Sequence, residues 1–195
     1  MDFQLWTDAL TKPKEVFSAQ KSKGSVGESA KNWAITGFVY GILIALSSQL
    51  IGNLLVPATG FNIVGLITSA VSSAIAFPIA MLVGHFILGL IAKAFGGKGE
   101  WSQHYFLMSL VAVPIYVLMG VLNLVPVVGG LIGSLLGLYM LYLLTLSLME
   151  THGLSMGKAF LVWVIPFALL MLIVFLVIGV AGLAILGMAA ANAPK

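Results

Sequence analysis

Three long stretches without a charged side chain constrain this sequence more than any other feature. They are bounded by the pairs Lys31 and Lys93, Glu100 and Glu150, and Lys158 and Lys195. Hydrocarbon excludes ions whereas water does not, so residues inside a bilayer are almost free of charge. The stretches, about 60, 50 and 36 residues long, therefore predict segments that lie inside a membrane.

The composition supports the same class of protein. Apolar residues make up 61% of the chain and charged residues 8%, against roughly 45–50% and 25% in soluble domains. The chain contains no cysteine, which excludes disulfides, thiolate metal sites and cysteine nucleophiles. It contains no arginine, the residue favoured for phosphate recognition, so no nucleic-acid partner is expected. We expect an all-α integral membrane protein.

Turn residues divide the charge-free stretches into five spans, since one span needs about 20 apolar residues. The dividing residues are Gly52, Asn53, Pro57 and Gly60 in the first stretch and Asn123, Pro126, Gly129 and Gly130 in the second. The expected spans are 33–52, 64–92, 105–123, 128–148 and 159–187. The second exceeds the length a bilayer requires, so it is either tilted or preceded by an interfacial turn at 61–68. The domains would be a leader (1–32), a five-span membrane domain (33–187) and a tail (188–195).

The lysines predict the orientation of the bundle. With five spans, eight of the nine lysines lie on one side of the membrane and only Lys195 lies on the other. Lysine-rich loops stay in the cytoplasm. We therefore expect a cytoplasmic N-terminus, an external C-terminus and a location in the cell membrane.

The leader has a helical pattern of its own. Phe3, Trp6 and Leu10 fall at helical spacing, and Pro13 interrupts them before a second short turn. This pattern predicts a short amphipathic helix at the membrane surface. The first 32 residues lack an early apolar run, so no cleaved signal peptide is expected.

Glycines at four-residue spacing are candidate helix-packing positions. They are Gly37 and Gly41 in the first span and Gly129, Gly133 and Gly137 in the fourth. Such ridges let membrane helices approach closely. We interpret them as packing within one protomer, and a homo-oligomer interface stays open as the alternative.

His85 is the one side chain other than tyrosine that can titrate and clearly lies within an expected span. An ionisable residue inside the membrane is a functional hypothesis in itself. It suggests a path through a small transporter or channel, lined by His85 with Ser69, Ser72 and Ser73. A neutral histidine bonded to a neighbouring carbonyl or serine explains the residue equally well.

The polar loops contain residues that could serve metal binding or catalysis. Glu100, His104, Glu150 and His152 are a carboxylate and imidazole set that a metal could use, but we favour a role in docking the two loops, or the leader, against each other. Gly96-Gly97-Lys98 lacks the flanking residues of a phosphate-binding loop, since position 92 is alanine and Gly99 replaces the Ser/Thr. No catalytic motif is present, so we expect neither an enzyme nor a bound metal or cofactor.

The segment from Lys93 to Pro166 resembles the Yip (Ypt-interacting protein) domain family. The matching residues are the loop Ala94-Phe95-Gly96-Gly97-Lys98-Gly99, Pro114, the turn Leu124-Val125-Pro126-Val127-Val128-Gly129, Leu138-Tyr139, Glu150-Thr151-His152-Gly153-Leu154-Ser155 and Lys158-Ala159. The leader residues 11–17 are similar to the short Pro/Phe element of that family. The first two spans match in hydropathy more than in individual residues.

The resemblance implies five helices, an N-terminus in the cytosol and a C-terminus across the membrane. Eukaryotic members are associated with traffic between endoplasmic reticulum and Golgi and with binding of prenylated Rab-type GTPases. Their polar N-terminal domain is longer, whereas about 32 residues are typical of bacterial and archaeal members. GTPase binding is therefore not carried over to this chain.

Together these observations predict a non-enzymatic multispan protein that organises membrane or recruits a protein partner through its cytoplasmic loops. The expected partner-binding residues are Gly96, Gly97, Lys98, Trp101, Glu150, His152 and Gly153. The bilayer is the expected lipid partner. The small transporter with a path near His85 is the alternative.

Overall fold

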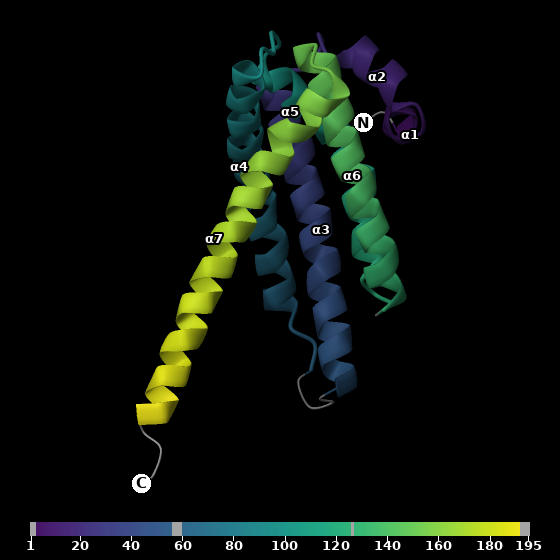
Figure 1. Ribbon diagram of the computed structural model, residues 1–195. Coiled ribbons are helices and arrows are strands. Elements are labelled where there is room, and N and C mark those ends of the chain that lie inside the picture. Colours follow the sequence, from purple (N-terminus) through teal and green to yellow (C-terminus); the bar gives the residue numbers. More distant parts are fainter. Residues whose placement is uncertain (1–2, 56–59, 126, 192–195) are drawn as a thin grey trace.

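The computed structural model describes residues 3–55, 60–125 and 127–191 (Figure 1). Within these ranges every regular element is a helix. The helices are α1 (Phe3–Thr11), α2 (Pro13–Gln20), α3 (Val26–Leu55), α4 (Ile63–Ala94), α5 (Trp101–Leu122), α6 (Val128–His152) and α7 (Met156–Ala191). The last five are long and apolar enough to cross a membrane, so the expected five-span all-α fold is confirmed.

The ends of the spans differ from the expected boundaries because capping groups, rather than hydropathy, set where a helix starts. Helix α3 begins at Val26, seven residues before the expected span at 33, and the Ser25 Oγ accepts a hydrogen bond from the Glu28 N–H at 3.1 Å. Helix α7 continues to Ala191, past the expected end at 187. The turn residues Pro57 and Pro126 and the tail residues 192–195 lie outside the described residues.

Helix α4 resolves the question of the long second span. It is one continuous helix of 32 residues with Pro78 inside it, which gives a length of about 48 Å at 1.5 Å per residue. The Asn62 side chain caps its first turn by accepting from the Gly65 N–H at 2.8 Å. Residues 63–68 therefore belong to the helix and do not form a separate interfacial turn.

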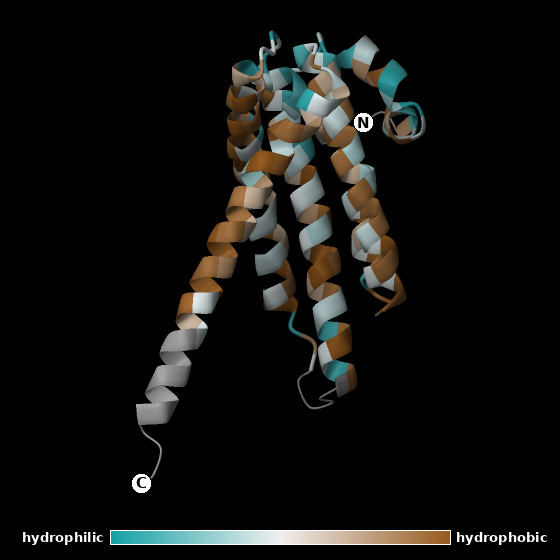
Figure 2. Ribbon diagram, viewed as in Figure 1, coloured by the Kyte–Doolittle hydropathy of each residue, from teal (hydrophilic) through white to brown (hydrophobic). Residues whose placement is uncertain are grey.

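Helix α5 occupies the centre of the bundle and α7 its edge. α5 packs against α3, α4 and α6, and 61% of its most apolar window is buried. For α7 the corresponding value is 6%, and Figure 1 shows its C-terminal half leaning away from the other spans. Figure 2 shows that hydrophobic residues dominate the described part of α7.

The leader forms two helices, where the sequence pattern predicts one short helix, a break and a second short turn, and both pack on the bundle. α1 contacts α5 and α2 contacts α6. Ala9 and Phe17 are fully buried in these contacts, and the Tyr139 hydroxyl donates a hydrogen bond to the Leu10 carbonyl. The leader is therefore part of the folded bundle rather than a free tail.

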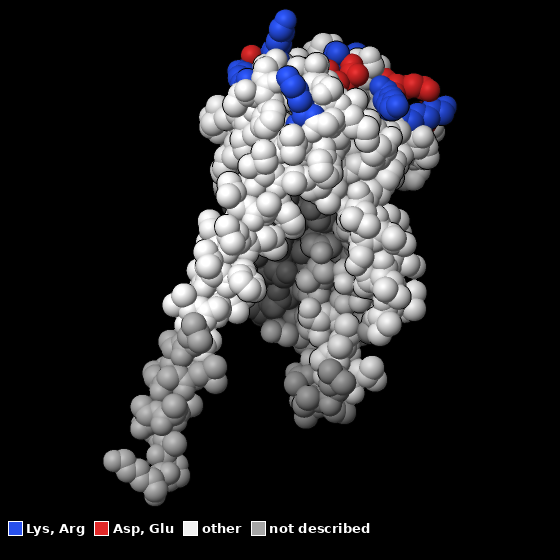
Figure 3. Space-filling model, viewed as in Figure 1, with Lys and Arg blue, Asp and Glu red and all other residues white. Residues whose placement is uncertain are grey.

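Lysine and acidic side chains gather at one end of the molecule in Figure 3. This charged end consists of the leader, the α4–α5 loop (residues 95–100) and the α6–α7 turn (residues 153–155). The far end, where α3 meets α4 and α5 meets α6, lacks charged residues in the described sequence. The segregation read from the sequence is thus preserved in three dimensions.

Candidate binding site at the charged end

A cleft of about 400 Å³ opens at the charged end, where three segments of the chain meet. Its lining residues are Lys21 from the leader, Gly96, Lys98 and Gly99 from the α4–α5 loop, and Glu150, Thr151, His152 and Gly153 from the end of α6. Five of the seven expected partner-binding residues are among them. The structure thus brings together residues that lie about 130 positions apart in the sequence.

The α4–α5 loop is held against the end of α6 by its main chain. The Gly97 N–H donates to the Ala92 carbonyl at 2.9 Å, and the Lys98 N–H donates to the His152 carbonyl at 3.1 Å. A Cβ on Gly97 would lie 2.9 Å from the His152 Cβ, and a Cβ on Gly99 would overlap the Thr151 carbonyl. Glycine at these two positions therefore allows the loop to approach α6.

Gly97 and Trp101 are not among the residues that line the cleft. Trp101 is the first residue of α5, and its ring packs edge-on against Phe86 with centroids 5.6 Å apart. Gly89 on α4 provides the space for it, since a Cβ there would overlap the Trp101 Cβ. Trp101 therefore joins α4 to α5, which leaves its proposed contact with a partner without geometric support.

Gly153 ends α6 in the left-handed conformation that glycine adopts without strain. Its φ is 66°, and its N–H donates to the Met149 carbonyl at 2.9 Å. A left-handed glycine of this kind is a common end of an α-helix. The turn that follows leads directly into α7 at Met156 and places Gly153 on the cleft wall.

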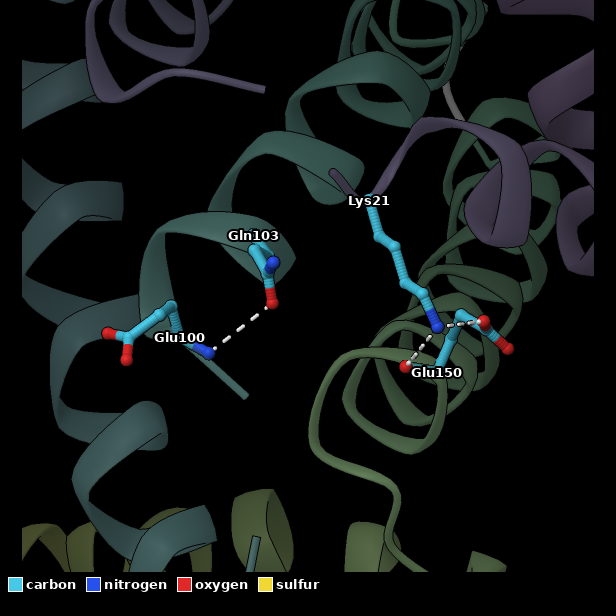
Figure 4. Close-up of polar contacts among 4 residues, drawn as sticks. All are labelled: Lys21, Glu100, Gln103 and Glu150. Atoms are coloured by element: carbon cyan, nitrogen blue, oxygen red, sulfur yellow. Dashed lines mark hydrogen bonds and ion pairs between the residues drawn. The ribbon is translucent and has the colours of Figure 1, made fainter. Parts of the chain in front are cut away.

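One ion pair ties the leader to the cleft. The Lys21 ammonium lies 2.7 Å from the Glu150 Oε1 and also donates to the Glu150 carbonyl at 3.4 Å (Figure 4). Both side chains are about one-third exposed, at 39% and 31%. Glu100 lies apart from this pair and is 3.9 Å from the Lys93 ammonium. The two carboxylates of the expected set thus serve separate contacts.

The three histidines of the chain form a buried row behind the cleft. The His104 Nδ1 lies 3.1 Å from the His152 Nε2, and the His104 Nε2 lies 2.9 Å from the His85 carbonyl. The His85 Nδ1 lies 2.8 Å from the Met81 carbonyl. All three side chains are buried. The row links α4, α5 and α6.

Sequence reasoning did not find this row. The sequence pattern places His85 alone within a span and the other two histidines in loops, whereas in the structure His104 lies inside α5 and His152 ends α6. One available signal is that all three lie toward the charged end of their helices. Within the described ranges, no group of three or more His, Asp or Glu residues could hold a metal ion.

The packing glycines divide into two groups. Gly37 and Gly41 face α4, since a Cβ on Gly37 would overlap the Ser73 carbonyl and one on Gly41 would lie 2.7 Å from the Ser69 carbonyl. A Cβ on Gly129 would lie closer still to a neighbouring carbonyl, that of Leu122. Gly133 has open space around it, and Gly137 has only the Met119 methyl group at 3.9 Å. A role of the last two in an oligomer stays a prediction.

A comparison with protein-family models identifies the relatives of this chain. The Yip1 domain model matches residues 7–178. The chain belongs to the Yip1 domain family. The match extends from α1 into α7 and includes every residue of the cleft. Comparisons with curated proteins and with solved structures find no match.

Proposed function

We propose that this multi-pass Yip1 domain protein recruits a protein partner at its charged end and performs no catalysis itself. The observation that carries the proposal is the cleft, because the leader, the α4–α5 loop and the α6–α7 turn each contribute to its wall. Every described charged residue lies in one of these segments or within a few residues of one. Chemistry available to a partner is therefore concentrated there.

The cleft supports recognition by charge and shape together. Lys98 is exposed on its rim, and Glu150 offers a carboxylate whose one ion pair among the described residues is with Lys21. The glycine loop is held by main-chain hydrogen bonds, so the surface exists before a partner binds. A partner segment carrying both an acidic and a basic group fits this pattern.

We also propose that the charged end faces the cytoplasm and that the membrane is the cell membrane. The support is the lysine count, with eight lysines at this end. The chain has no cysteine, so a single introduced thiol reports its side without background. We expect Ser22→Cys to react with a membrane-impermeant maleimide only in inverted vesicles, and Phe61→Cys only in intact cells. The opposite pattern would reverse the orientation.

The transporter alternative receives less support from the geometry. The His85 ring is enclosed by Trp33, His104 and Tyr105, with ring centroids 5.8, 5.3 and 5.5 Å away. The Ser69 hydroxyl donates to the Gly41 carbonyl at 3.0 Å, which joins α4 to α3. These residues pack the bundle where a permeation path would need open, polar space.

Site-specific photocrosslinking in cells tests partner recruitment. A photoreactive amino acid that replaces Lys98 would lie on the cleft rim. The matched control replaces Phe175, which is 75% exposed on α7. We expect discrete protein crosslinks from Lys98 that disappear when Glu150→Lys is added. Equal crosslinking at Phe175, or crosslinks from Lys98 that ignore the Glu150 change, would contradict the proposal.

A further inference from the structure

The hydrogen-bond pattern fixes which nitrogen of each histidine carries its proton. A carbonyl can only accept, so the His104 Nε2 beside the His85 carbonyl must be the protonated nitrogen. The His104 Nδ1 is then an acceptor, and the His152 Nε2 that faces it must carry a proton. By the same rule the His85 Nδ1 donates to the Met81 carbonyl. The row is complete with three neutral rings.

Only two nitrogens of this row remain without a partner, namely the His85 Nε2 and the His152 Nδ1. An added proton can enter at either of them without breaking a bond in the row. His152 is the better site, because it is the last residue of α6, and a helix C-terminus favours positive charge. It also lines the cleft, whereas His85 lies deeper, against Trp33.

A proton bound at His152 would place a positive charge on a side chain that is almost completely buried. Only 2% of the residue is exposed, and burying a charge is costly unless it is paired or hydrated. The residues facing the row from the surrounding segments that can carry charge are Lys21, Lys93, Lys98, Lys158, Glu100, Glu150 and Tyr105. Glu150 is engaged by Lys21. The exposed Glu100 carboxylate and the Gly99 carbonyl favour a proton at His152, but the cost of burial and the charge of Lys93 outweigh them.

The α4–α5 loop is the part that can move to hydrate His152. A Cβ on Gly97 would lie 2.9 Å from the His152 Cβ, and the Lys98 N–H donates to the His152 carbonyl. Gly96 has a φ of 90°, a backbone conformation that other residues adopt poorly, and it provides a hinge for the loop. Lifting this loop would bring water to the imidazole and widen the cleft at the same time.

We propose that the row of His85, His104 and His152 is a proton-responsive latch. With neutral rings it holds the α4–α5 loop on the end of α6, and a proton bound at His152 releases the loop and opens the cleft. The latch does not depend on which partner binds there, so it can be tested separately from recruitment.

Hydrogen exchange on the full-length protein in lipid nanodiscs tests the latch. The amides to follow are Gly97 and Lys98, whose hydrogen bonds hold the loop down. After correction for intrinsic exchange, we expect their protection to fall by at least about tenfold between about pH 7.5 and about pH 5, the range in which imidazoles change charge. Protection that does not change with pH would overturn the proposal.

Two variants separate the proton from other effects of acid. The amide of His152→Gln can still donate to His104 but cannot bind a proton, so its loop should stay protected at low pH. Thr151→Val removes the neighbouring hydroxyl, which also lacks a partner, and should behave as the parent protein. A loss of protection in His152→Gln equal to that of the parent would contradict the latch.

Imidazole nitrogen NMR provides a measurement that needs no variant. The chain contains three histidines, so ¹⁵N-histidine labelling gives a simple spectrum. At neutral pH we expect the Nδ1–H form for His85, the Nε2–H form for the other two, and a coupling across the His104–His152 hydrogen bond. A His152 ring that stays neutral while the loop opens at low pH would overturn the proposal.

Discussion

Helices α5 and α7 both span the membrane, but α5 is largely buried among other helices and α7 is largely exposed. The mean hydropathy of α5 is 2.2 and that of α7 is 3.1, whereas 61% of the α5 window is buried and only 6% of the α7 window. The most hydrophobic helix is thus the most exposed one. In a bilayer the lipid itself is apolar, so the strictest demand for apolar side chains falls on the outer surface.

The buried helix, by contrast, can carry polar groups because its neighbours supply partners. On α5 the Ser109 hydroxyl donates to the Phe106 carbonyl at 2.7 Å and accepts from the Asn32 amide at 3.1 Å. The Tyr105 hydroxyl donates to the Pro78 carbonyl at 3.2 Å. On α7 the Trp163 Nε1 donates to the Thr145 hydroxyl at 2.9 Å, close to the charged end. Beyond that point its described part is apolar and mostly exposed.

The largest difference in the free energy of unfolding should come from truncating one leucine to alanine in each of the two helices. Leu107 on α5 is fully buried and Leu172 on α7 is 53% exposed. We expect Leu107→Ala to lower the free energy of unfolding by about 2–5 kcal/mol, because a cavity is left in a packed core. Leu172→Ala should change it by less than about 0.5 kcal/mol.

Unfolding with sodium dodecyl sulfate from mixed micelles, followed by tryptophan fluorescence, measures both values. Trp33 is 1% exposed and packs in the same core as Leu107, so its emission reports the loss of that core. Equal effects of the two truncations would show that α7 is packed as tightly as α5. The comparison would then fail.

Added volume should separate the same two helices by a smaller amount. A Cβ on Gly120 of α5 would lie 2.7 Å from the Leu43 Cβ, whereas Gly179 of α7 has open space. We expect Gly120→Ala to cost about 1–3 kcal/mol through overpacking, and Gly179→Ala to be neutral or slightly stabilising because alanine favours helix. The same unfolding assay applies, and a neutral Gly120→Ala would place α3 farther from α5 than the structure does.

This contrast also explains what could be predicted from the sequence. The number of spans follows from where charges are missing, which is a local property, and the paired leader helices follow from Pro13 and the apolar spacing around it. Which span is central does not follow, because α4 and α5 have nearly equal hydropathy, 2.3 and 2.2, but 11% and 61% burial. Burial in a bilayer depends on neighbours that hydropathy does not encode.

The candidate site divides in the same way. Gly153 and the loop glycines were accessible to sequence reasoning because a helix end and a tight loop depend on nearby residues. The contacts of Lys21 with Glu150 and of His104 with His152 span 129 and 48 positions. Only the packing of α2, α5 and α6 brings those side chains together. The sequence analysis therefore named five of the eight residues that line the cleft, but not the contacts between distant segments that form it.

Loss of one hydrogen bond should have a more modest effect in each helix. Ser109→Ala leaves the half-buried Asn32 amide without its acceptor, and Trp163→Phe leaves the Thr145 hydroxyl without its donor. Hydrogen bonds between membrane helices contribute about 0.6 kcal/mol on average, and an unpaired buried group raises the cost toward about 1–2 kcal/mol. We expect Ser109→Ala to be the more damaging change in the unfolding assay. The reverse order would mean that the contact between α6 and α7 matters more than the central one.

The smallest effect on the free energy of unfolding should come from the half-buried ion pair between Lys21 and Glu150. Lys21 and Glu150 are both about one-third exposed, so solvent and salt screen their attraction. After that discount, we expect Lys21→Met to lower the free energy of unfolding by no more than about 0.5 kcal/mol. Lys23→Met is the matched control, because Lys23 is exposed and has no carboxylate within ion-pair distance among the described residues. A cost above that of Ser109→Ala, unchanged by salt, would show that the leader holds the bundle together as strongly as α5 does.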